Sequence, residues 1–230
     1  MPLGSSKSQR YKSPQLNLAD QILGEFVESR FDPEPKLFLP AGRIENLVTK
    51  ETIIKELQAK DNLASKALRL TRSSRMRIVD FVCEKAKIVF AITLLSGLDG
   101  KNIEWAMLRF MDPTINLTDE SLPIRGSIPV DNSVFRDEYS KSPWTDTRIH
   151  NFRRSQWQFL SPVFSQKNFS IELEPQHILP FTMRDDSVRE GAFGQVFQVD
   201  IHPAHRLNPA GNVRLPTQGI FGSFKKEEVT

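Results

Sequence analysis

The sequence predicts an α+β fold that divides into a helical domain over residues 17–120, an irregular connector over 121–177 and a β-rich segment over 178–230. Three observations support this division. Apolar residues recur at helical spacing in the first half, prolines then interrupt the chain, and strand-like runs separated by turns follow. Residues 1–16 are polar and lack periodicity, which predicts a disordered tail.

Composition narrows the class of protein. The chain has 230 residues, 39% of them hydrophobic, which is enough to bury a substantial core. Lysine and arginine number 31 against 28 aspartates and glutamates, so the net charge of +3 argues against a protein that coats nucleic acid. The balance of charge identifies no binding partner, and it leaves open a protein partner of unknown identity.

Cysteine usage and hydropathy bear on the compartment. The single cysteine, Cys83, excludes an intrachain disulfide and favours a reducing, intracellular location, cytoplasmic or nuclear. The longest apolar run, 88–95, is far shorter than the roughly 20 residues that cross a bilayer. The sequence therefore predicts no contact with a membrane.

The helical domain is predicted from several segments. Residues 16–31 carry apolar side chains at helical spacing and predict a helix that ends at the D-P-E-P sequence of 32–35. Residues 49–58 predict a second helix with Thr49 as its N-cap, and 102–110 predict a further short one.

The strongest helical pattern spans residues 73–97. Ser73 or Ser74 is expected to cap its start, and Gly97 stands where a C-terminal stop is expected. A helix with such a wide apolar face is predicted to form the centre of a bundle. The face consists of Ile78, Val82, Ala86, Val89 and Thr93, widened by Val79, Cys83, Phe90 and Leu94.

The connector contains one strongly aromatic stretch, residues 151–164. Phe152, Trp157, Phe159 and Phe164 would expose a large apolar area if they had no packing partner. We expect this stretch to pack onto the helical core or to support the β-rich segment that follows.

The β-rich segment contains a glycine pair, Gly191 and Gly194, in the sequence E-G-A-F-G-Q-V-F-Q-V. A glycine lets the backbone approach phosphate oxygens closely enough to donate its N–H groups. Phe193 at the tip would shield phosphates from water, and Val196 would rest on a purine ring. An ordinary β-hairpin turn explains the same glycines when they are considered alone.

The surrounding sequence resembles the glycine-rich loop of protein kinases, G-x-G-x-x-G-x-V, from its second glycine onward. Upstream segments, in their order and spacing, resemble the region ahead of the catalytic domain in fungal kinase-like proteins. They are the stretches at 39–57, 83–95, 119–124, 156–164 and 177–181. The resemblance implies that 178–230 is part of a kinase N-lobe, that ATP and Mg²⁺ are its ligands, and that Gly191, Ala192, Phe193, Gly194 and Val196 contact the nucleotide.

The sequence departs from the kinase pattern at two places. Arg189 occupies the position of the first glycine. In kinases a lysine that holds the phosphates is expected in the window that corresponds to residues 205–218, and these 14 residues contain no lysine. Lys225 and Lys226 come roughly twice as far along as kinases place it, and the chain contains no H-R-D or D-F-G sequence. We therefore expect a truncated kinase-like protein without catalytic residues; the rival interpretation is a helical module that binds a protein or nucleic acid.

For the other candidate residues, a structural interpretation stands beside the functional one. A basic face at 66–77 predicts either a solvated surface or a binding patch; it comprises Lys66, Arg69, Arg72, Arg75 and Arg77. His202 and His205 are weak metal-ligand candidates, because no cysteine is near. His150 and His177 are interpreted as structural, and Cys83 as an inert buried thiol.

Overall fold

The computed structural model describes residues 16–58, 71–125, 132–136, 142–165, 171–191, 194–207 and 218–221, with 186–191, 194–197 and 218–221 described by their backbone. The predicted tail therefore lies almost wholly outside the described residues. The fold is a mixture of helices and small antiparallel and parallel sheets, as the α+β prediction requires.

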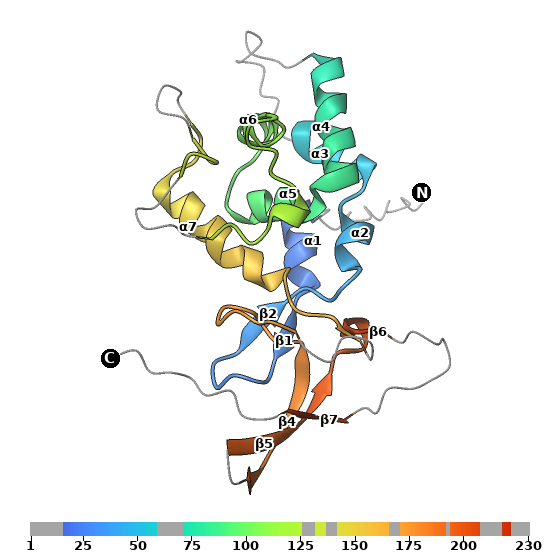
Figure 1. Ribbon diagram of the computed structural model, residues 1–230. Helices are drawn as coiled ribbons and strands as arrows, with labels where there is room; N and C mark the ends of the chain where they lie inside the picture. The colour runs from blue at the N-terminus through green and yellow to red at the C-terminus, as the bar shows by residue number, and fades with distance from the viewer. Residues whose placement is uncertain are drawn as a thin grey trace, which may run out of the picture.

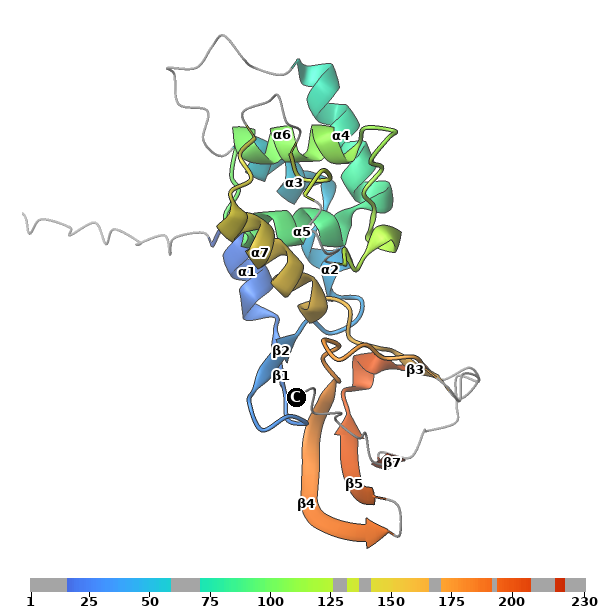
Figure 2. The ribbon, with the colours of Figure 1, turned by 60° about the vertical axis from the view of Figure 1, so that its left-hand side comes forward.

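Helices gather at one end of the molecule and strands at the other (Figures 1 and 2). The helices are α1 (Leu18–Gly24), α2 (Arg43–Leu47), α3 (Lys50–Gln58), α4 (Arg72–Lys85), α5 (Lys87–Leu95), α6 (Lys101–Phe110) and α7 (Asp146–Ser155), with single 3-10 turns at Asp119–Ser121, Gln156–Gln158 and Pro203–His205. Among the described residues, none of these helices has the length and apolarity needed to cross a membrane.

The strands form three small sheets. They are β1 (Val27–Ser29), β2 (Lys36–Phe38), β3 (Phe164–Ser165), β4 (Phe181–Gly191), β5 (Gly194–Ile201), β6 (Arg206–Leu207) and β7 (Gln218–Phe221). β1 pairs with β2, β3 pairs in parallel with β6, and β4, β5 and β7 form an antiparallel sheet with β5 in the middle. The strands predicted after residue 178 are thus present.

The first helix is shorter than predicted. α1 ends at Gly24, where the N–H of Glu25 donates to the carbonyls of Ile22 and Leu23. The remainder of the predicted helix is β1, which pairs antiparallel with β2 across the D-P-E-P turn. The prediction failed because Ser29 is fixed by a tertiary contact, its hydroxyl donating to the Leu179 carbonyl at 2.6 Å, that local periodicity does not reveal.

The second predicted helix and the final stop of the central one are confirmed. α3 follows Thr49, whose hydroxyl oxygen accepts a hydrogen bond from the Thr52 N–H at 3.4 Å. At the end of α5, Gly97 has φ +84°, and its N–H donates to the Leu94 carbonyl at 2.9 Å while Leu98 N–H reaches the Thr93 carbonyl at 3.4 Å. This pair of bonds is a Schellman motif.

The predicted central helix is two helices. The chain leaves helical geometry at Ala86 (φ −142°, ψ 35°), so α4 ends and α5 begins there. The N-cap is Thr71 instead of Ser73 or Ser74, because its side chain accepts from Ser74 N–H at 3.1 Å. α5 is nevertheless the predicted centre, since every residue from 89 to 94 is buried.

The predicted irregular connector contains a helix. Thr145 caps α7 by accepting a hydrogen bond from Arg148 N–H, a start signal that the proline-rich surroundings obscured. α7 places Phe152 in a buried aromatic cluster of the helical core. The other members of this cluster are Phe110, Phe135 and Trp144, with ring centroids 4.9–6.3 Å apart.

The aromatic stretch after α7 connects the two ends of the molecule. Phe159 contacts Phe26 with ring centroids 5.7 Å apart, and Phe164 stacks on Phe181 of β4 at 6.0 Å. Both expected roles of this stretch are therefore realised: its first part packs on the helical core, and its last part supports the sheet.

Candidate functional site

The glycine pair closes the hairpin between β4 and β5. Gly191 pairs with Gly194, Glu190 with Gln195, and Arg189 with Val196. The chain thus reverses through the residues between the two glycines, as in a tight hairpin. Of the predicted nucleotide-binding residues, Gly191, Gly194 and Val196 lie in these strands, whereas Ala192 and Phe193 lie outside the described residues.

The strand β4 is irregular between Asp185 and Arg189, where its register with β5 shifts. Extra residues in one strand bend it and increase its twist. Figure 2 shows β4 curving toward the tip of the hairpin, which extends away from the helices. The bend separates a supported base of the hairpin from a projecting tip.

The base of the hairpin is held by buried contacts. Phe181 and Val199 are buried, and the N–H of Arg30, next to β1, donates to the Phe181 carbonyl at 2.8 Å. The guanidinium of Arg184 donates to the Phe31 carbonyl at 2.7 Å and lies 5.7 Å from the centre of the Phe31 ring. Contacts from segments that are distant in the sequence thus hold the base of the hairpin in place.

A third strand completes the sheet beside the hairpin. β7 pairs antiparallel with β5, with Phe221 opposite Phe197 and Gln218 opposite Asp200. β7 ends at Phe221, and Lys225 and Lys226 follow it in the sequence but lie outside the described residues. Between β5 and β7 the chain also forms the turn Pro203–His205 and β6, which pairs with β3 in a separate sheet.

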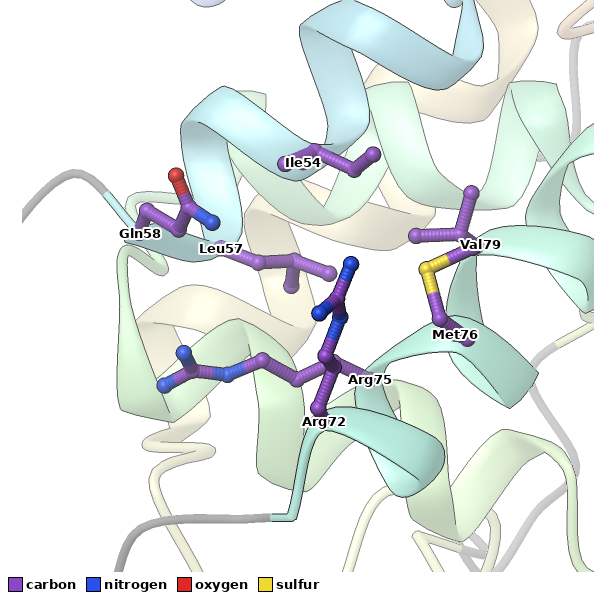
Figure 3. Close-up of a pocket in the computed structure, with 7 residues that line it drawn as sticks. All are labelled: Ile54, Leu57, Gln58, Arg72, Arg75, Met76 and Val79. Carbon is purple, nitrogen blue, oxygen red and sulfur yellow. The ribbon is translucent and has the colours of Figure 1, made fainter.

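A separate pocket lies between α3 and α4 (Figure 3). Its volume is about 410 Å³, within the range of small-ligand sites. Aliphatic side chains face it together with Arg72 and with Arg75, whose charge is paired with Glu104. Arg72 beside the aliphatic wall suits a group that combines an acid with an apolar body. The lining residues are Ile54, Leu57, Gln58, Arg72, Arg75, Met76 and Val79.

The predicted basic face does not form one surface. Arg75 points inward, where its Nε donates to Oε1 of the buried Glu104 on α6 at 2.5 Å. Arg72 and Arg77 are exposed on α4, and Lys66 and Arg69 lie outside the described residues. The prediction missed Arg75 because the sequence gives no sign that Glu104 is buried opposite it.

The remaining candidates have structural surroundings. His150 is exposed, and the ring of His177 accepts from Glu174 N–H at 2.8 Å and contacts Trp157. Cys83 is half-buried on α4, and this burial raises the pKa of its thiol, which lowers its reactivity at neutral pH. In the described part of the chain, no three His, Cys, Asp or Glu side chains gather as a metal site would require.

Sequence reasoning missed two polar residues with well-defined roles. Asp119 accepts a hydrogen bond from Val89 N–H at 2.9 Å and so caps the start of α5. His205 is buried and links two distant loops through its ring. Neither role has a local signal, because each partner lies more than 29 positions away in the chain.

Comparison with known proteins adds no relative: no family model, curated protein or solved structure matches the chain. The function must therefore be argued from the geometry of the hairpin and pocket and from the sequence motif.

Proposed function

We propose that the β4–β5–β7 sheet is part of a protein-kinase-like nucleotide-binding lobe and that this chain alone transfers no phosphate. The observation that carries the proposal is the direct pairing of Gly191 with Gly194 at the end of a long hairpin. Two glycines at a hairpin tip leave backbone N–H groups open to phosphate oxygens, whereas larger side chains would obstruct that approach.

The third strand supports the same proposal. In protein kinases the lysine that holds the α and β phosphates stands on the strand after the glycine hairpin. In this chain β7 pairs next to β5, and Lys225 and Lys226 follow its last residue, Phe221, by four and five positions. For either lysine to hold phosphate, the connection between β5 and β7 must be longer than its counterpart in kinases.

One residue, Arg189, departs from the pattern of the kinase glycine-rich loop. Arg189 stands where kinases have their first glycine, and it pairs with Val196, the residue proposed to contact the purine. Arginine in place of glycine adds bulk that would crowd this end of the loop, and it adds a positive charge that would attract a phosphate. We expect the loop to prefer polyphosphate over the base.

Nuclear magnetic resonance on the isotope-labelled full chain tests the proposal. Adding MgATP should shift the amide signals of Gly191 and Gly194, with half-saturation in the millimolar range. Inorganic tripolyphosphate should shift the same two signals, because phosphate is the group recognised. Gly194→Val should abolish both responses, whereas Gly24→Val, a matched change at the end of α1, should leave them intact.

Two outcomes would contradict the proposal. One is the absence of any shift at Gly191 and Gly194 up to about 10 mM MgATP, the upper end of the millimolar range expected for half-saturation. The other is a response confined to the α3–α4 pocket, which would assign phosphate binding to Arg72 and leave the hairpin as an ordinary turn.

The pocket favours a second candidate, a helical module that binds a protein. Its aliphatic wall and the exposed Arg72 suit a peptide with a leucine beside a glutamate. A labelled peptide of that kind should bind in fluorescence polarisation. Arg72→Glu should weaken binding about tenfold, the size expected for one charge-assisted hydrogen bond. Arg77→Glu, on the same helix but outside the pocket lining, is the matched control, and equal losses in both would refute a pocket-specific interaction.

A further inference from the structure

His205 lies at the junction between the helical and β-rich ends of the molecule. It is 2% exposed, at the end of the short turn that follows β5. Its Nε2 is 3.1 Å from the backbone nitrogen of Ala41, just before α2, and its Nδ1 is 3.0 Å from the carbonyl oxygen of Pro162. One ring thus connects three segments that are distant in the sequence.

These two contacts fix the protonation of the ring. A carbonyl oxygen only accepts, so Nδ1 must carry the proton that it donates to Pro162. The N–H of Ala41 only donates, so Nε2 must be the unprotonated acceptor. The contacts therefore require the neutral Nδ1–H form. Protonation of Nε2 would place two donors against each other and remove the bond to Ala41.

The surroundings of the ring also oppose a positive charge. Burial lowers the pKa of His205, and the neighbouring His202 acts in the same direction, while the carbonyls of Pro162 and Leu39 partly offset them. Burial together with Arg43 of α2 and Arg206 of β6 likewise lowers the pKa of His202, whose ring lies 5.9 Å from that of His205. Arg43 pairs with Glu25 at 3.4 Å, which places one carboxylate at the edge of this group.

The aromatic ring of Phe38, at the end of β2, packs edge-on against both imidazoles. Its centroid lies 5.2 Å from that of His205 and 5.7 Å from that of His202. Phe38 is fully buried, so the histidines form part of the packing between the β1–β2 sheet and the turn after β5. A positive charge on the buried His205 ring would be poorly hydrated.

We propose that His205 is a pH-sensitive clasp, which joins the loop before α2, the segment before β3 and the turn after β5 while neutral and releases them when protonated. The sign follows from the lowered pKa of the folded state. The stabilisation is fully present above the unfolded value of 6.5 and is lost as the pH falls below it, through the lower folded pKa. The clasp is independent of any nucleotide at the hairpin tip.

Hydrogen exchange on the full chain, read by nuclear magnetic resonance, tests the proposal. After correction for the intrinsic effect of pH, exchange of the Ala41 amide should rise about tenfold as the pH is lowered from about 7.5 to about 5, the effect of losing one hydrogen bond. The Phe90 amide, bonded to the Ala86 carbonyl within the core, reports global opening and should not change in parallel. The His205 ring signals should titrate over the same interval.

Two variants complete the experiment. His205→Gln offers an amide donor and a carbonyl acceptor without a titratable proton, so the pH response of Ala41 should disappear. His150→Gln removes an exposed imidazole on α7 and should retain the response. The proposal is overturned if Ala41 exchange is constant with pH, if it rises together with that of Phe90, or if the wild-type His205 ring stays neutral throughout. The wild-type measurements decide the matter even if His205→Gln does not fold.

Discussion

Asp119 shows how one side chain determines a helix boundary. The backbone could continue from α4 into α5 on local propensity, yet it breaks at Ala86 and α5 starts anew. The new start exposes N–H groups that have no partner within the helix. The Asp119 carboxylate supplies one, accepting from Val89 N–H, and lies beside those of Lys87 and Ile88. A cap from 30 residues away is invisible to sequence patterns.

The protonation of the Asp119 carboxyl group should contribute to the pH dependence of the protein's stability. Burial raises the pKa of Asp119 above 3.8, although the three N–H groups oppose this. Because the folded state then binds a proton more tightly than the unfolded state, this carboxyl group lowers the free energy of unfolding as the pH rises above 3.8. Urea denaturation at pH values from 3.8 upward should show that the free energy of unfolding of the wild type, relative to that of Asp119→Asn, falls as the pH rises.

Removing the Asp119 cap should also lower the stability of the protein at a fixed pH. Asp119→Ala should lower the free energy of unfolding at neutral pH by about 1 kcal/mol, as for other capping residues. Glu120→Ala, at the exposed neighbouring position, is the matched control and should have little effect. Equal losses for the two variants would show that Asp119 does not act through α5.

At the scale of elements, Gly97 ends α5 in a conformation that other residues adopt only with strain. Gly97→Ala should destabilise the protein by roughly 1–2 kcal/mol because its φ is +84°. Gly24→Ala, where no positive φ occurs and nothing lies within 4 Å of the new methyl group, should be neutral or slightly stabilising. Chemical denaturation of the two variants compares them directly, and a loss at Gly24 as large as that at Gly97 would contradict the conformational explanation.

The buried faces of α4 and α5 make a second prediction at this scale. Val82 and Val89 are 0% exposed, so aspartate at either position buries a charge without a partner. Val82→Asp or Val89→Asp should lower stability by several kcal/mol, about 4 or more, and unfold the helical end. Circular dichroism and thermal melts provide the measurement, with Ser73→Asp on the exposed side of α4 as control. If Val82→Asp and Val89→Asp had the same thermal melting curves as the parent protein, α4 and α5 would not form the buried core.

Elements with their own start and stop signals could be predicted, and those fixed by distant partners could not. α3 and α6 match the predicted segments closely, since Thr49 and the Asp-Pro sequence mark their ends. β1 was predicted as helix because its partner strand and the Leu179 carbonyl lie elsewhere in the chain. The hairpin was predicted from its glycines, whereas the pocket needed the helices to be placed first.

At the scale of the whole molecule, the hairpin tip projects away from the helices, and no second lobe encloses it in the described residues. A few backbone hydrogen bonds to phosphate contribute only about 0.5–1.5 kcal/mol each, against an association cost of at least about 4 kcal/mol. Isothermal titration should therefore give a dissociation constant for MgATP in the millimolar range. A micromolar constant would contradict this estimate.

Phosphoryl transfer should be absent from the isolated chain. It contains neither the H-R-D nor the D-F-G sequence that would orient an acceptor and hold metal ions. A radiolabel transfer assay should detect no product above that of a heat-denatured sample. Labelled product that tracks the purified chain would refute this expectation.

The lysines after β7 provide the sharpest check on where phosphate binds. If either one completes the site, Lys225→Ala or Lys226→Ala should remove the response of Gly191 and Gly194 to tripolyphosphate. Lys87→Ala, at the start of α5, is the charge-matched control. A response that survives both substitutions would show that the backbone of the hairpin suffices.

The hydrogen bonds from Ser29 to Leu179 and from Ala41 to His205 span 150 and 164 positions of the chain. A ribosome adding about 5–20 residues per second needs roughly 8–30 s to synthesise the intervening segment. During that interval the β1–β2 hairpin has been made, but its partners have not. Forming these two bonds requires closure of a long loop, which should slow folding relative to that of a bundle of local helices.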